Sequence, residues 1–221
     1  MLGKQQRVFA GFVYGALTVT CLTSRGGFAD TIVGYDAVNT PDGAPALDPL
    51  SGVTASDLIR GDGLKAGTGG TFNSSGWTDE ATDYLEWGGT TSDPLILTDL
   101  DLRYDRSASG PQAIDIRLST NGNAYASIFT DDSVSTAGED VLDIDLTSFT
   151  DVTSASFRLF GSGAASASGT FDIEPITGLS IPRGIVVNGT AAAVPEPAAI
   201  ELASIGMIGA MMRRGMNQRH K

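Results

Sequence analysis

The clearest alternation of apolar and charged residues in the chain is Leu95-Ile96-Leu97-Thr98-Asp99-Leu100-Asp101-Leu102-Arg103-Tyr104-Asp105. In an extended strand, successive side chains point to opposite faces of the sheet. One face would then carry the mostly apolar set Ile96, Thr98, Leu100, Leu102 and Tyr104. The other face would carry the charged set Asp99, Asp101, Arg103 and Asp105. This alternation predicts a half-buried β-strand with one face on the core and one face toward solvent.

The same two-residue period recurs along most of the chain. Eight further segments are predicted as strands, namely 31–37, 84–88, 114–118, 124–130, 142–146, 157–159, 171–174 and 183–188. Asn121-Gly122 predicts a hairpin turn between two of them. Residues 39–56 and 61–76 are expected to be loops, and 53–64 fits either a helical turn or an edge strand. About nine half-buried strands without helical crossovers predict an all-β, antiparallel β-sandwich or jelly roll built from two packed sheets.

Composition narrows the function classes. The 221 residues carry a net charge of -12, and of the 26 acidic residues only Glu196 and Glu201 lie outside residues 30–194. The strongly negative charge of residues 30–194 argues against nucleic acid as a partner. The only cysteine is Cys21 and the only histidine is His220. The body between them therefore lacks Cys-His and Ser-His-Asp catalytic groups and zinc sites built from Cys or His.

The N-terminus has the pattern of a secretory signal peptide. Lys4 and Arg7 precede the apolar run Val8–Leu22, and small residues around Ala29 offer a cleavage site. We therefore predict a signal helix within residues 1–29, with cleavage after Ala29. A lipobox at Cys21 is the alternative interpretation.

The C-terminus has three parts in a fixed order. Val194-Pro195-Glu196-Pro197 is followed by the apolar run Ala198–Met212 and then by Arg213-Arg214. A helix over the apolar run would span about 22 Å at ~1.5 Å per residue, shorter than the roughly 30 Å bilayer core. The basic end would lie on the cytoplasmic side. This pattern predicts a short transmembrane helix.

The tail resembles the PEP-CTERM sorting signal of bacterial exported proteins. The resemblance implies recognition and removal of the tail by an exosortase-type membrane protease. It also implies transient inner-membrane anchoring, and then secretion or display at the cell surface, in a host with an extracellular polysaccharide (biofilm) matrix. The expected organisation is a signal peptide (1–29), a β-sandwich domain (30–190), a linker with the Pro-Glu-Pro motif (191–197) and a sorting helix with a basic tail (198–221).

The body is also similar to β-sandwich modules of PEP-CTERM proteins. The similarity rests on short stretches: Gly52–Leu58, Phe72–Trp77, Arg106-Ser107, Gly110-Pro111, Phe157–Gly161 and Gly169–Ile176. It implies a sandwich fold for the body and brings no molecular activity with it.

Two carboxylate pairs are candidates for chemistry. Asp99 with Asp101, and Asp143 with Asp145, each lie two residues apart and would face one way on a strand, roughly 7 Å apart. Glycosidases use two carboxyl groups in a cleft. The favoured interpretation is instead a solvated sheet face, on which arginines of neighbouring strands would pair with these acids: Arg103, Arg117 and Arg158. We therefore assign no catalytic residue and expect a protein that is not an enzyme.

Loop carboxylates are the other acidic feature. They are Asp42, Asp48, Asp62, Asp131, Asp132, Glu139 and Asp140. A structural calcium ion is the cation that such residues would hold. No ligand set can be assigned, and neither a metal nor another cofactor is predicted.

Four aromatic residues are candidates for stacking on sugar rings. Trp77 lies in a Gly/Ser-rich loop, and Tyr84, Tyr125 and Phe160 fall in the outward phase of their strands. The alternative for each is ordinary packing. The phase places Trp87 and Tyr104 in the core instead.

These features favour a structural or adhesive protein of the cell surface or extracellular matrix. The first alternative is a carbohydrate-binding module with polysaccharide as its partner. A glycoside-acting enzyme is a third class, supported only by the carboxylate pairs.

Overall fold

The computed structural model describes residues 29–38, 40–78 and 81–192. Of the predicted signal peptide only Ala29 belongs to this part, and the Pro-Glu-Pro motif and the predicted helix over 198–212 lie outside it. Within the described ranges, no helix has the length and apolar character needed to cross a membrane.

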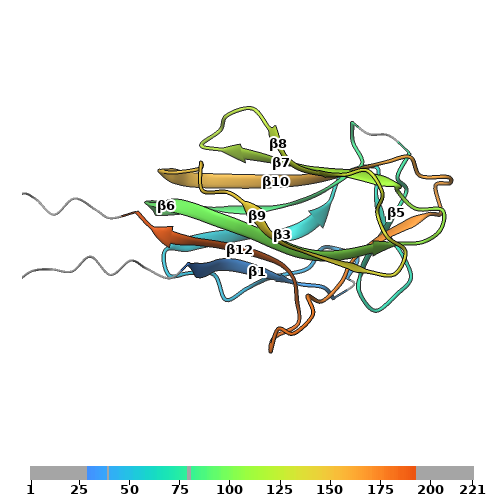
Figure 1. Ribbon diagram of the computed structural model, residues 1–221, viewed down its shortest axis with the longest axis horizontal. Helices are drawn as coiled ribbons and strands as arrows, with labels where there is room; N and C mark the ends of the chain where they lie inside the picture. The colour runs from blue at the N-terminus through green and yellow to red at the C-terminus, as the bar shows by residue number, and fades with distance from the viewer. Residues whose placement is uncertain (1–28, 39, 79–80, 193–221) are drawn as a thin grey trace, which may run out of the picture.

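The described residues form strands and no helix, and every strand pair is antiparallel (Figure 1). The prediction of an all-β, antiparallel fold is therefore confirmed for this part of the chain, with twelve strands instead of nine. The strands are β1 (Asp30–Asp36), β2 (Ala46–Leu47), β3 (Val53–Arg60), β4 (Lys65–Ala66), β5 (Phe72–Ser75), β6 (Tyr84–Arg106), β7 (Ala113–Thr120), β8 (Ala126–Asp131), β9 (Glu139–Asp145), β10 (Val152–Ser162), β11 (Thr170–Ile173) and β12 (Arg183–Ala191).

The long strand β6 organises the sheet. Its first half, residues 84–91, lies between β3 and β10. Its second half, residues 95–106, pairs with β12 and β9. The order β2-β1-β12-β6-β10-β7-β8 is therefore one continuous hydrogen-bonded sheet. The prediction was of two packed sheets; in the structure the strands belong to one hydrogen-bonded sheet, because β6 is long enough to pair with β3 and β10 in its first half and with β12 and β9 in its second.

The continuous sheet encloses one core. Buried side chains from the first half of β6, such as Leu85 and Trp87, belong to the same cluster as Leu100 and Leu102 from its second half. The ring of Trp87 stacks on Phe157 of β10, with centroids 5.5 Å apart and planes only 2° apart. Trp87 and Tyr104 are fully buried, which confirms the core position predicted for both.

The alternation predicted for β6 is interrupted at Thr98. The pairing with β12 passes from Leu97 directly to Asp99, so Thr98 is the extra residue of a β-bulge. The bulge shifts the phase by one residue, and Leu97 is buried together with Leu100 while Ile96 is only partly buried. The prediction that Ile96 shares the core face with Leu100 was therefore wrong.

Two loop predictions need correction and one turn is confirmed. Residues 53–60, left open between a helical turn and an edge strand, form β3, which pairs with β6. The predicted loops contain the short strands β2, β4 and β5. The hairpin turn lies where predicted, between β7 and β8, with φ values of 53° at Asn121 and 76° at Gly122.

Candidate functional site

The outward side of β6, β10 and β7 carries charged and aromatic side chains. Leu85, Phe157 and Ile116 point into the core and are buried, so the residues next to them in each strand point outward. In register, Phe160 lies opposite Tyr84. Seven partly buried residues make up what we call the arginine–aromatic face: Tyr84, Glu86, Arg117, Tyr125, Ser156, Arg158 and Phe160.

Arg158 is the most connected residue of this face. Its guanidinium carbon lies 4.2 Å from the ring centroid of Tyr84 and 4.5 Å from that of Tyr125. Its Nε donates to Glu86 Oε2 at 2.9 Å. Partial burial acts to lower the pKa of Arg158, but the charge and hydrogen bond of Glu86 together with the neighbouring Tyr125 and Tyr84 outweigh it, and the pKa is raised. The guanidinium is therefore held between two rings and remains charged.

Glu86 and Tyr125 are tied together through a serine. Ser156 Oγ donates to Glu86 Oε1 at 3.1 Å and lies 2.7 Å from the hydroxyl of Tyr125. Since the ion pair between Glu86 and Arg158 is partly exposed, it contributes about 1 kcal/mol or less to stability. Its main effect is to orient the polar groups of the face.

A second arginine continues the face on β7. The guanidinium carbon of Arg117 lies 4.4 Å from the ring centroid of Phe160, and its Nε donates to Asp115 Oδ2 at 2.6 Å. The rings of Phe160 and Tyr84 meet with centroids 5.4 Å apart. Aromatic rings and guanidinium groups thus alternate across three strands.

A groove continues this face at one end. Its volume is about 440 Å³, and its lining includes Glu86 and Ser156 of the arginine–aromatic face. Small residues and hydroxyl groups supply the rest: Thr54, Ala55, Ser56, Gly88, Gly89, Thr90, Ser119, Gly122, Ser154 and Ala155. The groove therefore offers many neutral hydrogen-bonding groups and one carboxylate.

Three of the four predicted ligand-contacting residues meet on the arginine–aromatic face. Tyr84, Tyr125 and Phe160 are partly exposed there. Trp77 lies elsewhere and is only 4% exposed. Its indole N–H donates to Ser74 O at 2.9 Å and its ring packs edge-on against Phe171. The expectation that Trp77 presents its ring to a ligand does not hold, because the Gly/Ser-rich segment around it is partly a strand, β5, that packs onto β11.

The sequence indicated Arg117 and Arg158 as ion-pair partners of strand acids, but it did not single out Glu86 or place these three residues on one face. The predicted partners of the two arginines were the acids of the two carboxylate pairs at residues 99, 101, 143 and 145. In the structure Arg117 pairs with Asp115 and Arg158 with Glu86. Arg103 likewise pairs with Asp140. The available signal was the outward phase that Arg158 shares with Phe160, but cross-strand partners depend on register, which a single sequence does not give.

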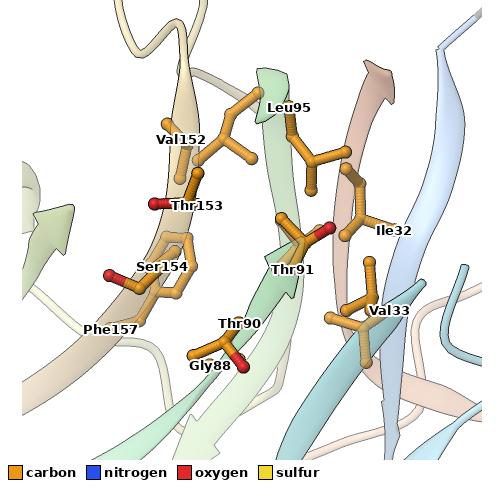
Figure 2. Close-up of a pocket in the computed structure, with 15 residues that line it drawn as sticks. Ile32, Val33, Gly88, Thr90, Thr91, Leu95, Val152, Thr153, Ser154 and Phe157 are labelled. Atoms are coloured by element: carbon orange, nitrogen blue, oxygen red, sulfur yellow. The ribbon is translucent and has the colours of Figure 1, made fainter. Parts of the chain in front are cut away.

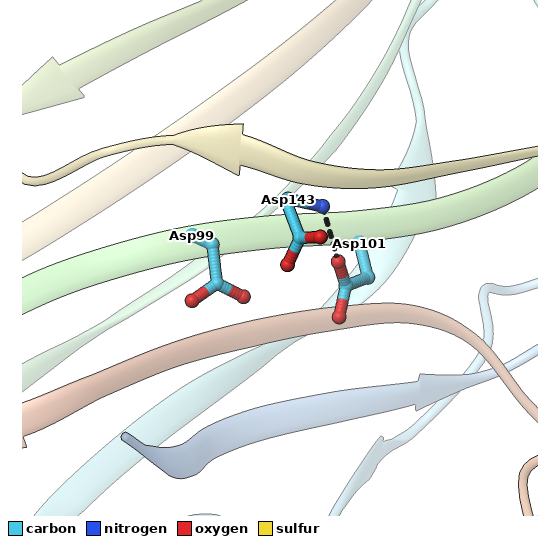
Figure 3. A group of neighbouring side chains, drawn as sticks. All are labelled: Asp99, Asp101 and Asp143. Carbon is cyan, nitrogen blue, oxygen red and sulfur yellow. Dashed lines mark hydrogen bonds between the residues drawn. The ribbon is translucent and has the colours of Figure 1, made fainter. Parts of the chain in front are cut away.

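The strand carboxylates form a different cluster, shown in Figure 3. One carboxylate oxygen each from Asp99, Asp101 and Asp143 lies within 4.8 Å of the others. Asn188 Nδ2 donates to Asp99 Oδ1 at 2.5 Å, and the backbone N–H of Asp143 donates to Asp101 Oδ1 at 2.8 Å. Burial, with the charges of Asp99 and Asp143, raises the pKa of Asp101.

The predicted carboxylate pairs are therefore regrouped. Asp143 joins Asp99 and Asp101, whereas Asp145 accepts hydrogen bonds from the backbone and hydroxyl of Thr147. A divalent cation such as calcium is the kind of ion that the three clustered carboxylates could hold. The loop acids proposed from sequence are not in this group.

Two facing acids, Asp172 and the partly buried Asp105, lie at the far end of β6. Asp172 of β11 lies directly opposite Asp105 and is 9% exposed. Burial, together with the charge and hydrogen bond of Asp105, raises the pKa of Asp172 to about 7. Thr71 Oγ1 lies 3.5 Å from Asp172 Oδ1 and favours the charged form.

One small pocket, lined by residues of β1, β6 and β10, is too small for a sugar. Figure 2 shows it lined by apolar side chains from β1, β6 and β10, including Ile32, Leu95, Val152 and Phe157. Its volume is about 30 Å³, which is room for only one or two water molecules at roughly 10–15 Å³ each. It is therefore a packing gap in the core.

Comparisons with known proteins give no family. No protein-family model matches the sequence, and no match is found among curated proteins. Among solved structures, the chain is similar to a point mutant of CBM29-2, a family 29 carbohydrate-binding module, complexed with mannohexaose. The identity is 14% and the TM-score 0.42, over 76% of this chain and 100% of that one.

Two other similar structures are also carbohydrate-related by their descriptions. TmCBM61 in complex with β-1,4-galactotriose shows 13% identity and a TM-score of 0.34, over 62% of this chain and 88% of that one. The Podospora anserina GH26-CBM35 β-(1,4)-mannanase shows 14% identity and a TM-score of 0.36, over 67% of this chain but only 29% of the mannanase chain. At this level of similarity, a ligand has to be argued from the side chains of this chain itself.

Proposed function

We propose that this chain is a non-catalytic carbohydrate-binding module of an exported protein. The observation that carries the proposal is the continuity between the arginine–aromatic face and the hydroxyl-lined groove, which share Glu86 and Ser156. A sugar presents hydroxyl groups around its rim and C–H groups on its faces. Binding sites for such ligands combine apolar surface with a few well-placed polar groups. The rings of Tyr84 and Phe160, which meet on the arginine–aromatic face, supply the apolar part.

The groove supports binding better than hydrolysis. Glycosidases typically act with two carboxyl groups at the scissile bond. The groove lining includes one carboxylate, Glu86, and this group is engaged by Arg158 and Ser156. We therefore retain the proposal that the chain is not an enzyme.

The order of the functional hypotheses changes accordingly. The sequence favoured a structural or adhesive protein, with carbohydrate binding as the alternative. The geometry of the face puts carbohydrate binding first, and attachment to an extracellular polysaccharide would be the way in which such a module adheres. Export through the signal peptide, release by an exosortase-type protease and a place at the cell surface remain proposals supported by the sequence of the two ends.

The test is a glycan array with the purified full chain. The proposal expects binding to a defined set of glycans. The signal should fall about fivefold in Tyr84→Ala and Phe160→Ala, since an aromatic contact contributes on the order of 1 kcal/mol. Leu179→Ala, at an exposed residue outside the face, is the matched control. A blank array, or variants that bind like the wild type, would refute the proposal.

The sorting proposal has a separate test. Mass spectrometry of the protein recovered from the surface of producing cells should find the chain ending near Pro195–Pro197. Peptides from residues 198–221 in the mature surface protein would contradict processing of the tail.

A further inference from the structure

Two like charges face each other on the arginine–aromatic face. Arg117 of β7 lies directly opposite Arg158 of β10. Like charges at directly opposed positions of neighbouring strands destabilise a sheet. Each arginine also has a carboxylate beside it, Asp115 for Arg117 and Glu86 for Arg158, and these two acids offset the repulsion.

Aromatic rings hold the two guanidinium groups in place. Arg158 is held against Tyr84 and Tyr125, and Arg117 against Phe160. In the described part of the chain each guanidinium bonds its carboxylate partner through Nε. The Nη edges of both groups make no hydrogen bond there, and 43% of the Arg117 side chain and 29% of the Arg158 side chain is exposed. Planar guanidinium edges held in this way suit bidentate binding of a carboxylate.

The pair lies in the middle of the path that a bound glycan would follow. On one side, Ser156 and Ser119 lie opposite each other and line the groove. On the other side, Phe160 and Asp115 lie opposite each other and line a pocket of about 210 Å³. A chain that runs along these strands from the groove to the pocket passes over both arginines.

We propose that Arg117 and Arg158 together bind a sugar carboxylate, so that the ligand is a polysaccharide containing uronic acid residues. This inference rests on the proposed carbohydrate-binding function and names the class of its ligand. The net charge of -12 opposes a densely charged polyanion. Asp115 and Glu86 beside the arginines also leave room for only a local negative charge. The carboxylates of the ligand are therefore spaced by neutral sugars.

The test compares acidic and neutral versions of the same sugars by titration calorimetry with the purified full chain. The probes are oligosaccharides that carry one uronic acid residue and their carboxyl-reduced, neutral counterparts, taken backbone by backbone. We expect the acidic form of the bound backbone to have a Kd at least about tenfold lower, because hydrogen bonds to a charged group are the stronger ones. The advantage should shrink as salt is raised.

Variants assign the preference to the arginines. Arg117→Gln should lower the ratio of affinities for the acidic and neutral forms to near one, and Arg103→Gln, at the separate ion pair with Asp140, should leave that ratio as in the wild type. Circular dichroism melts check that each variant is folded, and the comparison of the two probes with the wild type needs no variant.

The outcomes separate the two proposals. Equal affinity for both forms, or tighter binding of the neutral form, overturns the carboxylate inference and leaves the carbohydrate-binding function standing. Failure to bind any of the sugars overturns both.

Discussion

The phenol hydroxyl of Tyr35 donates a hydrogen bond to the carbonyl of Gly88 at 3.0 Å and accepts one from its backbone N–H at 3.1 Å. Tyr35 is on β1 and Gly88 is in the first half of β6, so this contact joins strands that are not neighbours in the sheet. Burial raises the pKa of Tyr35, which keeps the phenol neutral and able to donate. These two hydrogen bonds therefore link β1 to the first half of β6 across the core.

Tyr35→Phe is expected to lower the free energy of unfolding by about 1–3 kcal/mol, because the N–H of Gly88 would lose its partner in a buried place. Urea denaturation measures the change. Tyr84→Phe is the matched control, since the hydroxyl of Tyr84 makes no hydrogen bond within the described residues, and it should cost well under about 1 kcal/mol. Equal effects of the two substitutions would show that the contact does not stabilise the fold.

Asp172→Asn is expected to flatten the pH dependence of stability. The pKa of Asp172 is raised to about 7 in the fold, against about 3.9 in an unfolded chain. Between these values the folded state binds more protons than the unfolded state, so stability falls as pH rises from about 4 to about 7. One group contributes at most about 1.4 kcal/mol per pH unit.

Thermal melts at pH 5 and pH 8 provide the measurement for Asp172. The wild type should lose stability between them, and the asparagine variant should lose less and be the more stable of the two at pH 8. Asp42→Asn, at an exposed loop residue, controls for the change in net charge. Parallel pH profiles for wild type and the Asp172 variant would contradict the raised pKa.

Asp143→Asn is expected to stabilise the fold by several tenths of a kcal/mol. It removes one charge from the cluster with Asp99 and Asp101. Asp143 also has a φ of 60°, in the left-handed region that asparagine tolerates better than most residues. Asp143→Ala removes the same charge but is disfavoured at this φ, by about 1 kcal/mol. Chemical denaturation should therefore rank the asparagine variant above the alanine variant, and the reverse order would contradict the backbone argument.

Arg158→Lys is expected to weaken glycan binding by about tenfold with less than about 1 kcal/mol of destabilisation. Lysine keeps the charge but loses the planar stacking on Tyr84 and Tyr125 and the bond from Nε to Glu86. Calorimetric titration with a bound glycan is the measurement. Arg103→Lys, at an ion pair of similar exposure, should bind like the wild type. Unchanged binding in Arg158→Lys would mean that charge alone matters at this position.

The sequence by itself determined the all-β class, most strands and several core residues. The reason is that in a half-buried strand the core residues recur at every second position, as in Ile114–Leu118. The same pattern was misleading at residues 142–146, where Ile144 and Leu146 are buried but Leu142 is 52% exposed. Trp87 and Tyr104 could be placed in the core from phase alone. Short strands such as β4, with two residues, are below the length at which a period can be read.

The tertiary structure alone decided which outward residues meet. The bulge at Thr98 changes the phase within β6, and the bends of β6 bring it into contact with β3, β10, β12 and β9 in turn. The sequence put Tyr84, Tyr125 and Phe160 on outward phases but not on one face, and it misplaced Trp77. Arg117 and Arg158 stand opposite each other only because of the register between β7 and β10. β7 and β10 are not joined by a hairpin turn that would fix their register, so the alternation within each strand does not tell which of their residues pair.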